Sequence, residues 1–376
     1  MIYDIIILRC KLGDFMKYVI CAGGTGGHIY PALAIINKIK LEDKKADILY
    51  IGTTDRMEKD IVPSRGIKYK GIEIVGLNRK NIFKNIKVFK VYKNAINSAY
   101  EILNKFKPDI LIGVGGYITL PVCMAAKKLN IPILIHEQNS IPGLSNKIIS
   151  KYAKAICVSL PGSLKLFPKN KTIYTGNPRS EEIISSKIVK KSSLGFDQDK
   201  KLVIIVMGSL GSTVMSDKLL ELVPKFENKN YQVLLVTGKA YYDKFKEFEL
   251  SNVKIVDYYD KLINIMKDSD LIISRAGAST ISEICSIGLP SILVPSPYVT
   301  HNHQYKNALE LENAGACILL EEKDFESDKV INEIDKLFDN GDLYKRMHKA
   351  SLDLGVRDSG DRIYHVISEI VGDKNG

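Results

Sequence analysis

The sequence contains no run of about 18 uninterrupted apolar residues, the length that a membrane-spanning helix needs, so we expect no helix that crosses a bilayer. None of its six cysteines lies in a CxxC pair, which argues against zinc and disulfides and predicts reduced, buried thiols as in a cytoplasmic protein. Aromatic residues are not interleaved with basic ones as a stacking platform for bases. This last absence argues against a nucleic-acid binder.

Positive charge, in contrast, is present in excess. The formal net charge of +11 favours an anionic partner such as a phosphorylated substrate or an acidic membrane surface. The excess is concentrated between residues 68 and 93, where Glu73 is the single acid among many lysines. Apolar residues at helical spacing (Ile82, Ile86 and Phe89) lie in the same segment. Such a stripe commonly packs on its own core, but with this charge it also suits docking on an anionic leaflet.

Short runs of Ile, Val and Leu that end in glycine or polar turns alternate with amphipathic stretches, and this series occurs twice. Apolar runs separated by helices are typical of parallel strands that are covered on both faces. The first series has expected strands at 17–22, 47–52, 109–114, 131–136, 155–159 and 172–175, with helices at 30–41, 82–106, 118–130 and 143–153. The second has strands from 201 and at 232–237, 253–256, 271–274, 291–295 and 316–320. We predict an α/β protein with two doubly wound, Rossmann-like parallel-sheet domains facing across a cleft.

The change of domain is expected near Pro178, which interrupts regular structure. We predict a first domain over 16–178, a second over 179–356, and a C-terminal helix within 357–376 that packs back on the first. Met16 opens a typical protein start, so we expect residues 1–15 to be a non-native extension.

The segment CAGGTGGHIYPALA, residues 21–34, places four glycines and His28 where a buried strand passes into a helix. It fits neither the GxGxxG frame nor the P-loop frame, because Ile29 stands at the third glycine and no Lys-Ser/Thr follows. A glycine turn at a helix N-terminus still offers free N–H groups and a positive dipole end to a phosphate. The same reasoning applies to the turns at 113–121, 207–212 and 274–283. In the last of these, Arg275 is a further candidate for binding a diphosphate.

Two further segments carry polar side chains at strand ends. The segment HEQN, residues 136–139, follows the end of a buried strand. We expect Asn139 to contact a ligand, whereas for Glu137 contact with a ligand and contact with an adjacent loop are equally expected. In HNHQYKNA, residues 301–308, the two histidines lack an evident third metal ligand, so we expect no metal site there.

Taken together, GGTGGHxxPA, GGY, HEQN, GNPR, GSxG, AxTxSE and HQxxNA strongly resemble the MurG family, in order and over nearly the whole chain. These are the peptidoglycan N-acetylglucosaminyltransferases that convert lipid I to lipid II. The resemblance implies the two-domain GT-B fold, UDP-GlcNAc as donor, and an inverting attack of the C4 hydroxyl of MurNAc on C1 of the donor. It implies no obligatory metal or other cofactor. The motif glycines and polar residues then have expected roles.

Donor binding is implied for Thr25, Gly26, Gly27, Asn139, Arg179, Ser209, Tyr259, Ala278, Ser279, Thr280, Glu283 and Gln304. Within this set the resemblance assigns phosphates to Ser209 and 278–280, ribose to Glu283, uracil to Tyr259 and sugar hydroxyls to Gln304. Acceptor diphosphate binding is implied for Gly23, Gly24, Gly115, Gly116 and Tyr117. His28 is the candidate general base, since imidazole titrates near neutral pH, and Glu137 is its rival. Alternatively, His28 positions the acceptor phosphate or caps its own helix.

A lipid-linked acceptor implies a peripheral protein on the cytoplasmic face of the cell membrane, with an anionic phospholipid surface and other cell-wall synthesis proteins as partners and no nucleic acid. Membrane docking is expected for Lys80, Ile82, Phe83, Lys84, Ile86 and Lys87. The alternatives are another GT-B enzyme, such as a diacylglycerol glycosyltransferase, and a UDP-GlcNAc epimerase, which would need one substrate and no membrane face.

Overall fold

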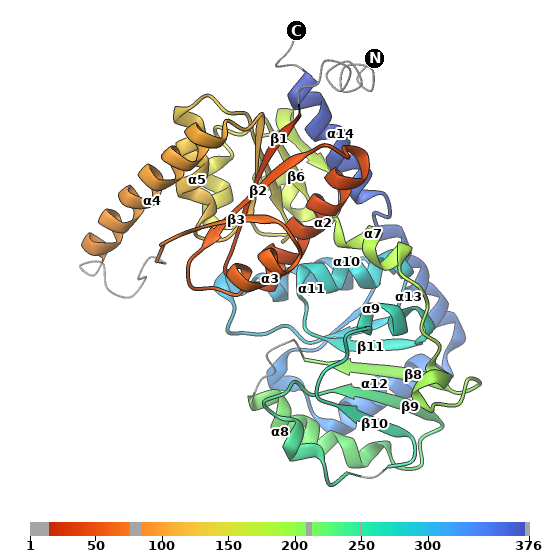
Figure 1. Cartoon of the computed structure of the whole chain (residues 1–376). Coiled ribbons are helices and arrows are strands. Elements are labelled where there is room, and N and C mark those ends of the chain that lie inside the picture. The colour runs from red at the N-terminus through yellow and green to blue at the C-terminus, as the bar shows by residue number, and fades with distance from the viewer. Residues whose placement is uncertain (1–14, 76–84, 208–212, 249, 373–376) are drawn as a thin grey trace. The chain divides into compact units, whose positions relative to one another are not determined.

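A computed structural model describes residues 15–75, 85–207, 213–248 and 250–372 of the chain, without the side chains of residues 85–89. The chain divides into two compact units (Figure 1). Unit 1 comprises the residues up to 179 together with those from 358 onward, and unit 2 comprises residues 180–357. The sequence placed the change of domain one residue earlier, after 178.

Unit 1 is built on a parallel sheet in the order β3-β2-β1-β4-β5-β6-β7. Its strands are β1 (Lys17–Ala22), β2 (Asp47–Thr53), β3 (Lys68–Ile72), β4 (Ile110–Gly115), β5 (Ile133–Glu137), β6 (Ala155–Val158) and β7 (Thr172–Tyr174). Its helices are α2 (Gly26–Glu42), α3 (Glu58–Ser64), α4 (Asn85–Phe106), α5 (Thr119–Lys128), α6 (Leu144–Ile149) and α14 (Ser359–Gly372). Helix α7 (Arg179–Ser185) begins at the unit boundary, and all its residues after Arg179 belong to unit 2. Short 3-10 turns cover Pro161–Leu166 and Lys169–Lys171.

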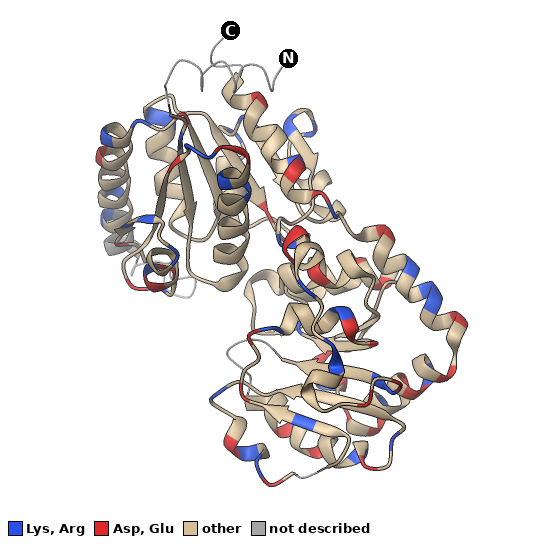
Figure 2. Ribbon diagram, turned by 45° about the vertical axis from the view of Figure 1, so that its right-hand side comes forward, with Lys and Arg blue, Asp and Glu red and all other residues tan. Residues whose placement is uncertain are grey.

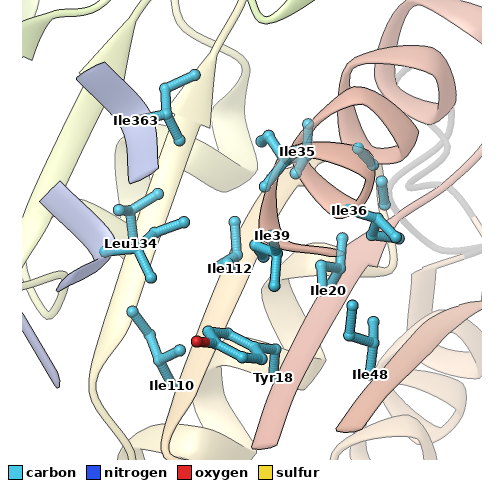
Figure 3. Close-up of a cluster of buried hydrophobic side chains, with 14 of the residues drawn as sticks. Tyr18, Ile20, Ile35, Ile36, Ile39, Ile48, Ile110, Ile112, Leu134 and Ile363 are labelled. Carbon is cyan, nitrogen blue, oxygen red and sulfur yellow. The ribbon is translucent and has the colours of Figure 1, made fainter. Parts of the chain in front are cut away.

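The sheet of unit 1 is buried on both faces, which explains its continuous apolar strands. One face packs against α2 and α14, and Figure 3 shows Ile363 of α14 in the same cluster as Leu134 of β5 and Ile39 of α2. The other face packs against α4, α5 and α6, which contribute Ala99, Val122 and Ile149 among others. The last helix of the chain therefore completes the core of unit 1.

Unit 2 repeats the design with a parallel sheet in the order β10-β9-β8-β11-β12-β13. Its strands are β8 (Lys201–Val206), β9 (Tyr231–Val236), β10 (Val253–Val256), β11 (Leu271–Ser274), β12 (Ser291–Leu293) and β13 (Ile318–Leu319). Its helices are α8 (Thr213–Leu222), α9 (Leu262–Ile265), α10 (Ala278–Ile287), α11 (His303–Asn313), α12 (Ser327–Asp339) and α13 (Gly341–Leu354). Short 3-10 turns cover Lys191–Leu194, Val223–Phe226, Tyr242–Phe245, Met266–Asp268, Thr300–Asn302 and Glu322–Asp324. The prediction of two Rossmann-like parallel sheets is confirmed.

Two elements of unit 1 were absent from the sequence prediction. Strand β3 reads KYKGI and lies at the edge of the sheet, where only Ile72 is buried. Edge strands with alternating lysines lack the apolar run that marks a central strand. Helix α3 spans only seven residues, too few for a clear helical period. Helix α2 also begins at Gly26, four residues before the predicted start, so the last two glycines of the loop are helical.

Basic and acidic residues are distributed along the chain of both units, as the coloured ribbon in Figure 2 shows. Among the described residues, no helix has the length and apolar character needed to span a membrane. The five cysteines within the described part of the chain are free and buried, and burial raises the pKa of each thiol, to about 12 for Cys157 and Cys285. These thiols are therefore unreactive at neutral pH.

Candidate functional site

The strand order places two glycine turns of unit 1 side by side. Strand β1 pairs with β2 on one side and with β4 on the other, so the chain reverses its winding direction between β1 and β4. Ligands of open parallel sheets bind beyond the carboxyl ends of the strands at such a switch point. The turn after β1 contains Gly23–His28, and the turn after β4 contains Gly115–Tyr117. The N–H of Gly23 donates to the carbonyl of Gly115 at 3.2 Å, which joins the two turns.

Glycine is required at this junction because the two backbones touch. Gly115 and Gly116 have φ values of +124° and +94°, in the region that favours glycine. A Cβ on Gly116 would overlap the backbone of Gly23, and one on Gly115 would lie 2.5 Å from Nδ1 of His28. The glycines therefore bring the imidazole and both turns to one edge of the sheet. Tyr117 follows them and is exposed.

The loop after β1 leaves the N-terminus of α2 open. Thr25 is the N-cap residue, and its side chain makes no capping hydrogen bond. Thr25 and Gly27 are exposed, whereas Gly26 and His28 are half-buried. The first turn of a helix has N–H groups without intrahelical partners, and here the N-cap side chain does not accept from them. This end of the helix can therefore accept an anion.

The side chain of Gln138 contacts the imidazole of His28. Its Nδ1 lies 3.1 Å from Oε1 of Gln138, a buried side chain directly after β5. The amide nitrogen of Gln138 donates to the carbonyl of Val114 at 2.8 Å and lies 2.9 Å from Nδ1 of His136. Nε2 of His136 lies 3.1 Å from the carbonyl of Gly176. A continuous polar chain thus leads from the half-exposed imidazole into the interior of unit 1.

The second histidine of this chain, His136, is fully buried. Burial lowers its pKa to about 4, with the hydrogen bond to Gly176 acting in the opposite direction and the nearby His28 lowering it further. His136 is consequently neutral at physiological pH, with one ring nitrogen that donates and one that accepts.

Glu137 has a different environment from the one that a general base needs. Its carboxylate is buried and accepts four hydrogen bonds: from the backbone and side-chain nitrogens of Asn139 at 3.0 and 3.2 Å, from Gly143 at 2.9 Å and from Asn146 at 2.9 Å. All four donors come from the loop that follows β5 and the helix after it. The geometry therefore favours a loop-stabilising role for Glu137 and leaves His28 as the better candidate base. Asn139 is half-buried at the same edge.

A second buried carboxylate, which the sequence did not point to, stabilises the glycine loop. Glu58 lies in the first turn of α3 and is fully buried. It accepts from the N–H and hydroxyl of Thr53 at 3.0 and 2.8 Å and from the N–H of Gly24 at 3.3 Å. A Cβ on Gly23 would overlap Glu58, so this glycine makes room for the carboxylate. The only signal in the sequence is the polar segment TTDRME after the second strand.

Arg179 lies at the end of unit 1. Its N–H donates to the side chain of Asn177 at 3.1 Å, and its guanidinium lies 5.6 Å from the centre of the Tyr30 ring. The structure thus associates the arginine of GNPR with helix α2 of unit 1.

The corresponding switch point of unit 2 lies between β8 and β11. Helix α10 begins directly after β11, with Gly277 as its N-cap and no side chain that caps it. Ala278 is buried, Thr280 is half-buried, and the buried hydroxyl oxygen of Ser279 has no hydrogen-bond partner among the residues that the structure describes. Buried polar atoms normally have a hydrogen-bond partner, so an unpaired hydroxyl at an uncapped helix N-terminus is a candidate anion-binding site. Glu283 is buried one turn further along the helix.

Arg275, a candidate for binding a diphosphate at this turn, is engaged with protein groups. Its side chain is buried, donates to the carbonyl of Val294 at 3.2 Å and forms an ion pair with Glu322 at 2.5 Å. A buried charge needs such a partner, because desolvation is otherwise too costly. Arg275 therefore holds the end of β12 and the chain near Glu322 together.

The remaining predicted residues of unit 2 surround α11 and β10. Gln304 lies in the first turn of α11, and its Oε1 accepts from the N–H of Ser296 at 2.8 Å. The side chain of Asn307 donates to the carbonyl of Ala276 at 3.3 Å, which ties α11 to the turn before α10. Tyr259 is half-buried, and burial raises the pKa of its phenol, with Asp260 adding to the effect.

Several predicted residues lie outside the described part of the chain. They are Ser209 and, from the expected membrane-docking segment, Lys80, Ile82, Phe83 and Lys84. The backbone of Ile86 and Lys87 belongs to the first turn of α4, but their side chains are not described. Among the described residues, no group of three or more His, Cys, Asp or Glu side chains could hold a metal ion.

Comparison with known proteins relates both units to one family. The glycosyltransferase family 28 N-terminal domain matches residues 18–158, and the C-terminal domain of the same family matches residues 202–363. A UDP-N-acetylglucosamine–N-acetylmuramyl-(pentapeptide) pyrophosphoryl-undecaprenol N-acetylglucosamine transferase of Halalkalibacterium halodurans is 41% identical over 361 residues, covering 94% of this chain and 99% of the relative.

Solved structures share the fold at lower identity. MurG of Acinetobacter baumannii has a TM-score of 0.75 at 24% identity, covering 94% of this chain and 99% of its own. A UDP-GlcNAc 2-epimerase of Neisseria meningitidis, bound to UDP-GlcNAc, has a TM-score of 0.64 at 16% identity, covering 94% of this chain and 100% of its own. The fold is therefore shared by transferases and epimerases, and it does not by itself distinguish the two activities.

Proposed function

This chain belongs to the MurG family, and we propose that it transfers GlcNAc from UDP-GlcNAc to the C4 hydroxyl of MurNAc in lipid I, giving lipid II and UDP. The observation that carries the proposal is the 41% identity to a named transferase along 99% of that relative's length. An identity of this size, over a length that spans both domains, favours the transferase over the epimerases, of which the one compared is 16% identical.

We place the donor diphosphate at the N-terminus of α10. The open cap at Gly277 and the unpaired hydroxyl of Ser279 support this placement, because a phosphate would satisfy both. Thr280 and Ser209 are proposed as further phosphate contacts. Glu283 is proposed to accept the ribose hydroxyls, Gln304 to contact GlcNAc and Tyr259 to lie near uracil. Thr25, Gly26, Gly27 and Asn139 are proposed to reach the donor sugar, and Arg179 its uracil or phosphates.

The acceptor diphosphate is proposed to lie against the two glycine turns of unit 1. Gly24 is exposed, and a Cβ there would meet no atom within 4 Å, so its backbone is accessible to a phosphate, while Tyr117 is exposed in the turn after β4. Gly23, Gly115 and Gly116, which bring the two turns into contact, are proposed as further parts of this site. The uncapped N-terminus of α2 adds a positive dipole end in the same place. These features suit a pyrophosphoryl group.

In the proposed reaction, His28 acts as the general base. Its imidazole takes the proton from the C4 hydroxyl of MurNAc while that oxygen bonds to C1 of GlcNAc. The bond between C1 and the phosphate oxygen breaks, and UDP leaves with the electron pair. The helix N-terminus at α10 would stabilise the charge that develops on UDP, and we propose that no metal ion is needed for this.

The reaction is tested by measuring UDP release from UDP-GlcNAc with and without a lipid I analogue, for the wild type and His28→Ala. We expect release that depends on the acceptor and that falls by about 100-fold or more in the variant. His365→Ala removes an exposed histidine of α14 and should retain wild-type activity. Conversion of UDP-GlcNAc to its 2-epimer without acceptor would replace the proposal with the epimerase activity. Equal activity of His28→Ala and wild type would refute the base assignment.

We further propose peripheral docking on an anionic membrane through Lys80, Ile82, Phe83, Lys84, Ile86 and Lys87, because the lipid-linked acceptor lies in the bilayer. Each basic residue near such a surface contributes on the order of 1 kcal/mol. Replacing Lys80, Lys84 and Lys87 by Glu should lower binding to anionic vesicles and leave activity on a short-chain soluble acceptor near normal. Equal loss in both assays would refute the docking role.

A further inference from the structure

The orientation of the Gln138 amide is determined by its surroundings. The atom that faces the carbonyl of Val114, at 2.8 Å, must be the amide nitrogen, because a carbonyl oxygen only accepts hydrogen bonds. The reversed amide would place two acceptors against each other in the interior, where an unpaired polar group costs about 1–3 kcal/mol. The oxygen of Gln138 therefore faces His28.

This orientation determines which nitrogen of His28 carries the hydrogen. Oε1 of Gln138 only accepts, and it lies 3.1 Å from Nδ1 of His28. Nδ1 must consequently be the N–H group. In the neutral imidazole, the lone pair then lies on Nε2. We propose that Gln138 is a positioning residue that holds neutral His28 in its Nδ1–H form, so that Nε2 is the atom that accepts a proton.

The hydrogen bonds of His136 support the same orientation of the Gln138 amide. Its Nε2 donates to the carbonyl of Gly176 at 3.1 Å, which leaves Nδ1 as an acceptor. That acceptor lies 2.9 Å from the amide nitrogen of Gln138 and takes its second hydrogen. Because burial holds His136 neutral, this acceptor persists at physiological pH. Both amide hydrogens of Gln138 are thus used inside the protein, and its oxygen is left for His28.

Packing adds to the effect by limiting rotation of the ring. The His28 imidazole lies against Gly115, where any larger residue would overlap Nδ1 and Cε1. The ring is therefore held between the glycine turn after β4 and the amide of Gln138. The importance of the His28 tautomer for turnover rests on the transferase function proposed above, whereas the tautomer itself is a property of the protein without substrates.

The tautomer is measured by long-range proton–nitrogen NMR on the full chain labelled with 15N-histidine, at about pH 8, where ordinary imidazoles are neutral. The resonances of His28 are assigned by their loss in His28→Asn. We expect the wild type to show the Nδ1–H pattern. A predominant Nε2–H pattern in the folded wild type would overturn the proposal, whatever the variants do.

Two variants connect the tautomer to turnover. Gln138→Met keeps the shape but removes the acceptor, so we expect Nε2–H to appear and kcat to fall about 10- to 100-fold, with KM for UDP-GlcNAc changed less than about threefold. Gln138→Glu keeps an acceptor opposite Nδ1, provided that its other oxygen is protonated and donates to the carbonyl of Val114, so it should show the Nδ1–H pattern and recover part of kcat. A loss of kcat in Gln138→Met with the tautomer unchanged would overturn the link.

The matched control is Ser159→Ala. Its hydroxyl lies 3.4 Å from Nε2 of His136, so this variant disturbs the same buried chain without contacting Gln138 or His28. We expect its tautomer and kcat to match the wild type. If Gln138→Met does not fold, the wild-type spectrum and Gln138→Glu still decide the proposal. If neither the wild type nor any of these variants transfers GlcNAc, the proposed function fails while the tautomer result stands.

Discussion

The turn after β1 in unit 1 and the turn after β11 in unit 2 both lie at the switch point of their sheets, between β1 and β4 and between β8 and β11. Their polar side chains differ in how far other described residues of the protein satisfy them. In unit 1, Glu58 binds the glycine loop and Gln138 binds His28. The starts of α2 and α10 both lack a capping side chain, but only at α10 is a side-chain hydroxyl, that of Ser279, buried without a partner among the described residues. The first turn is organised to hold one side chain in a defined state, whereas the second leaves a buried side-chain donor for a ligand.

This difference predicts that polar residues of the two turns will respond differently to substitution. Residues that complete the unit 1 network should contribute mainly to folding stability, because their removal leaves buried groups unpaired. Residues at the start of α10 should contribute mainly to ligand binding. The following variants test this, from the largest expected effect to the smallest.

The largest effect is expected for Glu58→Ala. It leaves the N–H and hydroxyl of Thr53 and the N–H of Gly24 without their acceptor, and we expect the free energy of unfolding of unit 1 to fall by about 4 kcal/mol. Urea unfolding followed by circular dichroism measures this loss. Asp60→Ala, on the exposed side of the same helix, is the matched control and should stay within about 0.5 kcal/mol of wild type. A loss below about 1 kcal/mol for Glu58→Ala would remove the contrast between the two turns.

A pH-dependent effect is expected from His136. Its pKa is about 4 in the folded protein and about 6.5 in the unfolded chain, so between these values only the unfolded chain takes up the proton. The free energy of unfolding should therefore fall as pH decreases from about 7 to 4, by about 3 kcal/mol from this residue. His136→Leu should lack that part of the slope, as measured by urea unfolding at each pH.

The control for this titration is His365→Ala, because His365 is an exposed histidine of unit 1. It should retain the wild-type slope. If the free energy of unfolding of His136→Leu depends on pH as that of the wild type does, His136 is not the group that resists protonation. The assignment of His136 as a neutral partner of Gln138 would then have to be revised.

The central strands and the glycine turns were predictable because they depend on local sequence. Apolar runs such as LVIIV mark strands that are buried on both faces, and the parallel arrangement follows from the alternation with helices. Strand β3 was missed because its lysines and edge position remove that run. The sequence also identified His28, since a histidine in a glycine loop is conspicuous.

The partners of these residues were not predictable, because they depend on strand register and on distant segments. Glu58 reaches Gly24 only because β2 lies beside β1. The orientation of Gln138 depends on the carbonyl of Val114, which belongs to the neighbouring strand β4. The sequence marked Arg275 as a candidate for binding a diphosphate, but it did not reveal its partner Glu322, which lies 47 residues further along the chain. Candidate residues that a local pattern marks were therefore accessible from the sequence, while contacts between distant residues were not.

The smallest expected effect, and the one that tests the second turn directly, is that of Ser279→Ala. Its hydroxyl has no partner in the free protein, so its removal should leave the free energy of unfolding unchanged or raise it by up to about 1 kcal/mol. Binding of UDP, measured by calorimetry, should weaken about 5- to 30-fold, since one hydrogen bond to a charged group is lost. Ser286→Ala, in the same helix, removes a hydroxyl that donates to the carbonyl of Ser282 at 2.6 Å, and it should lower stability slightly without changing UDP binding. If Ser279→Ala instead lowers stability and leaves UDP binding intact, the start of α10 is organised like the turn in unit 1, and the donor diphosphate must be sought elsewhere in unit 2.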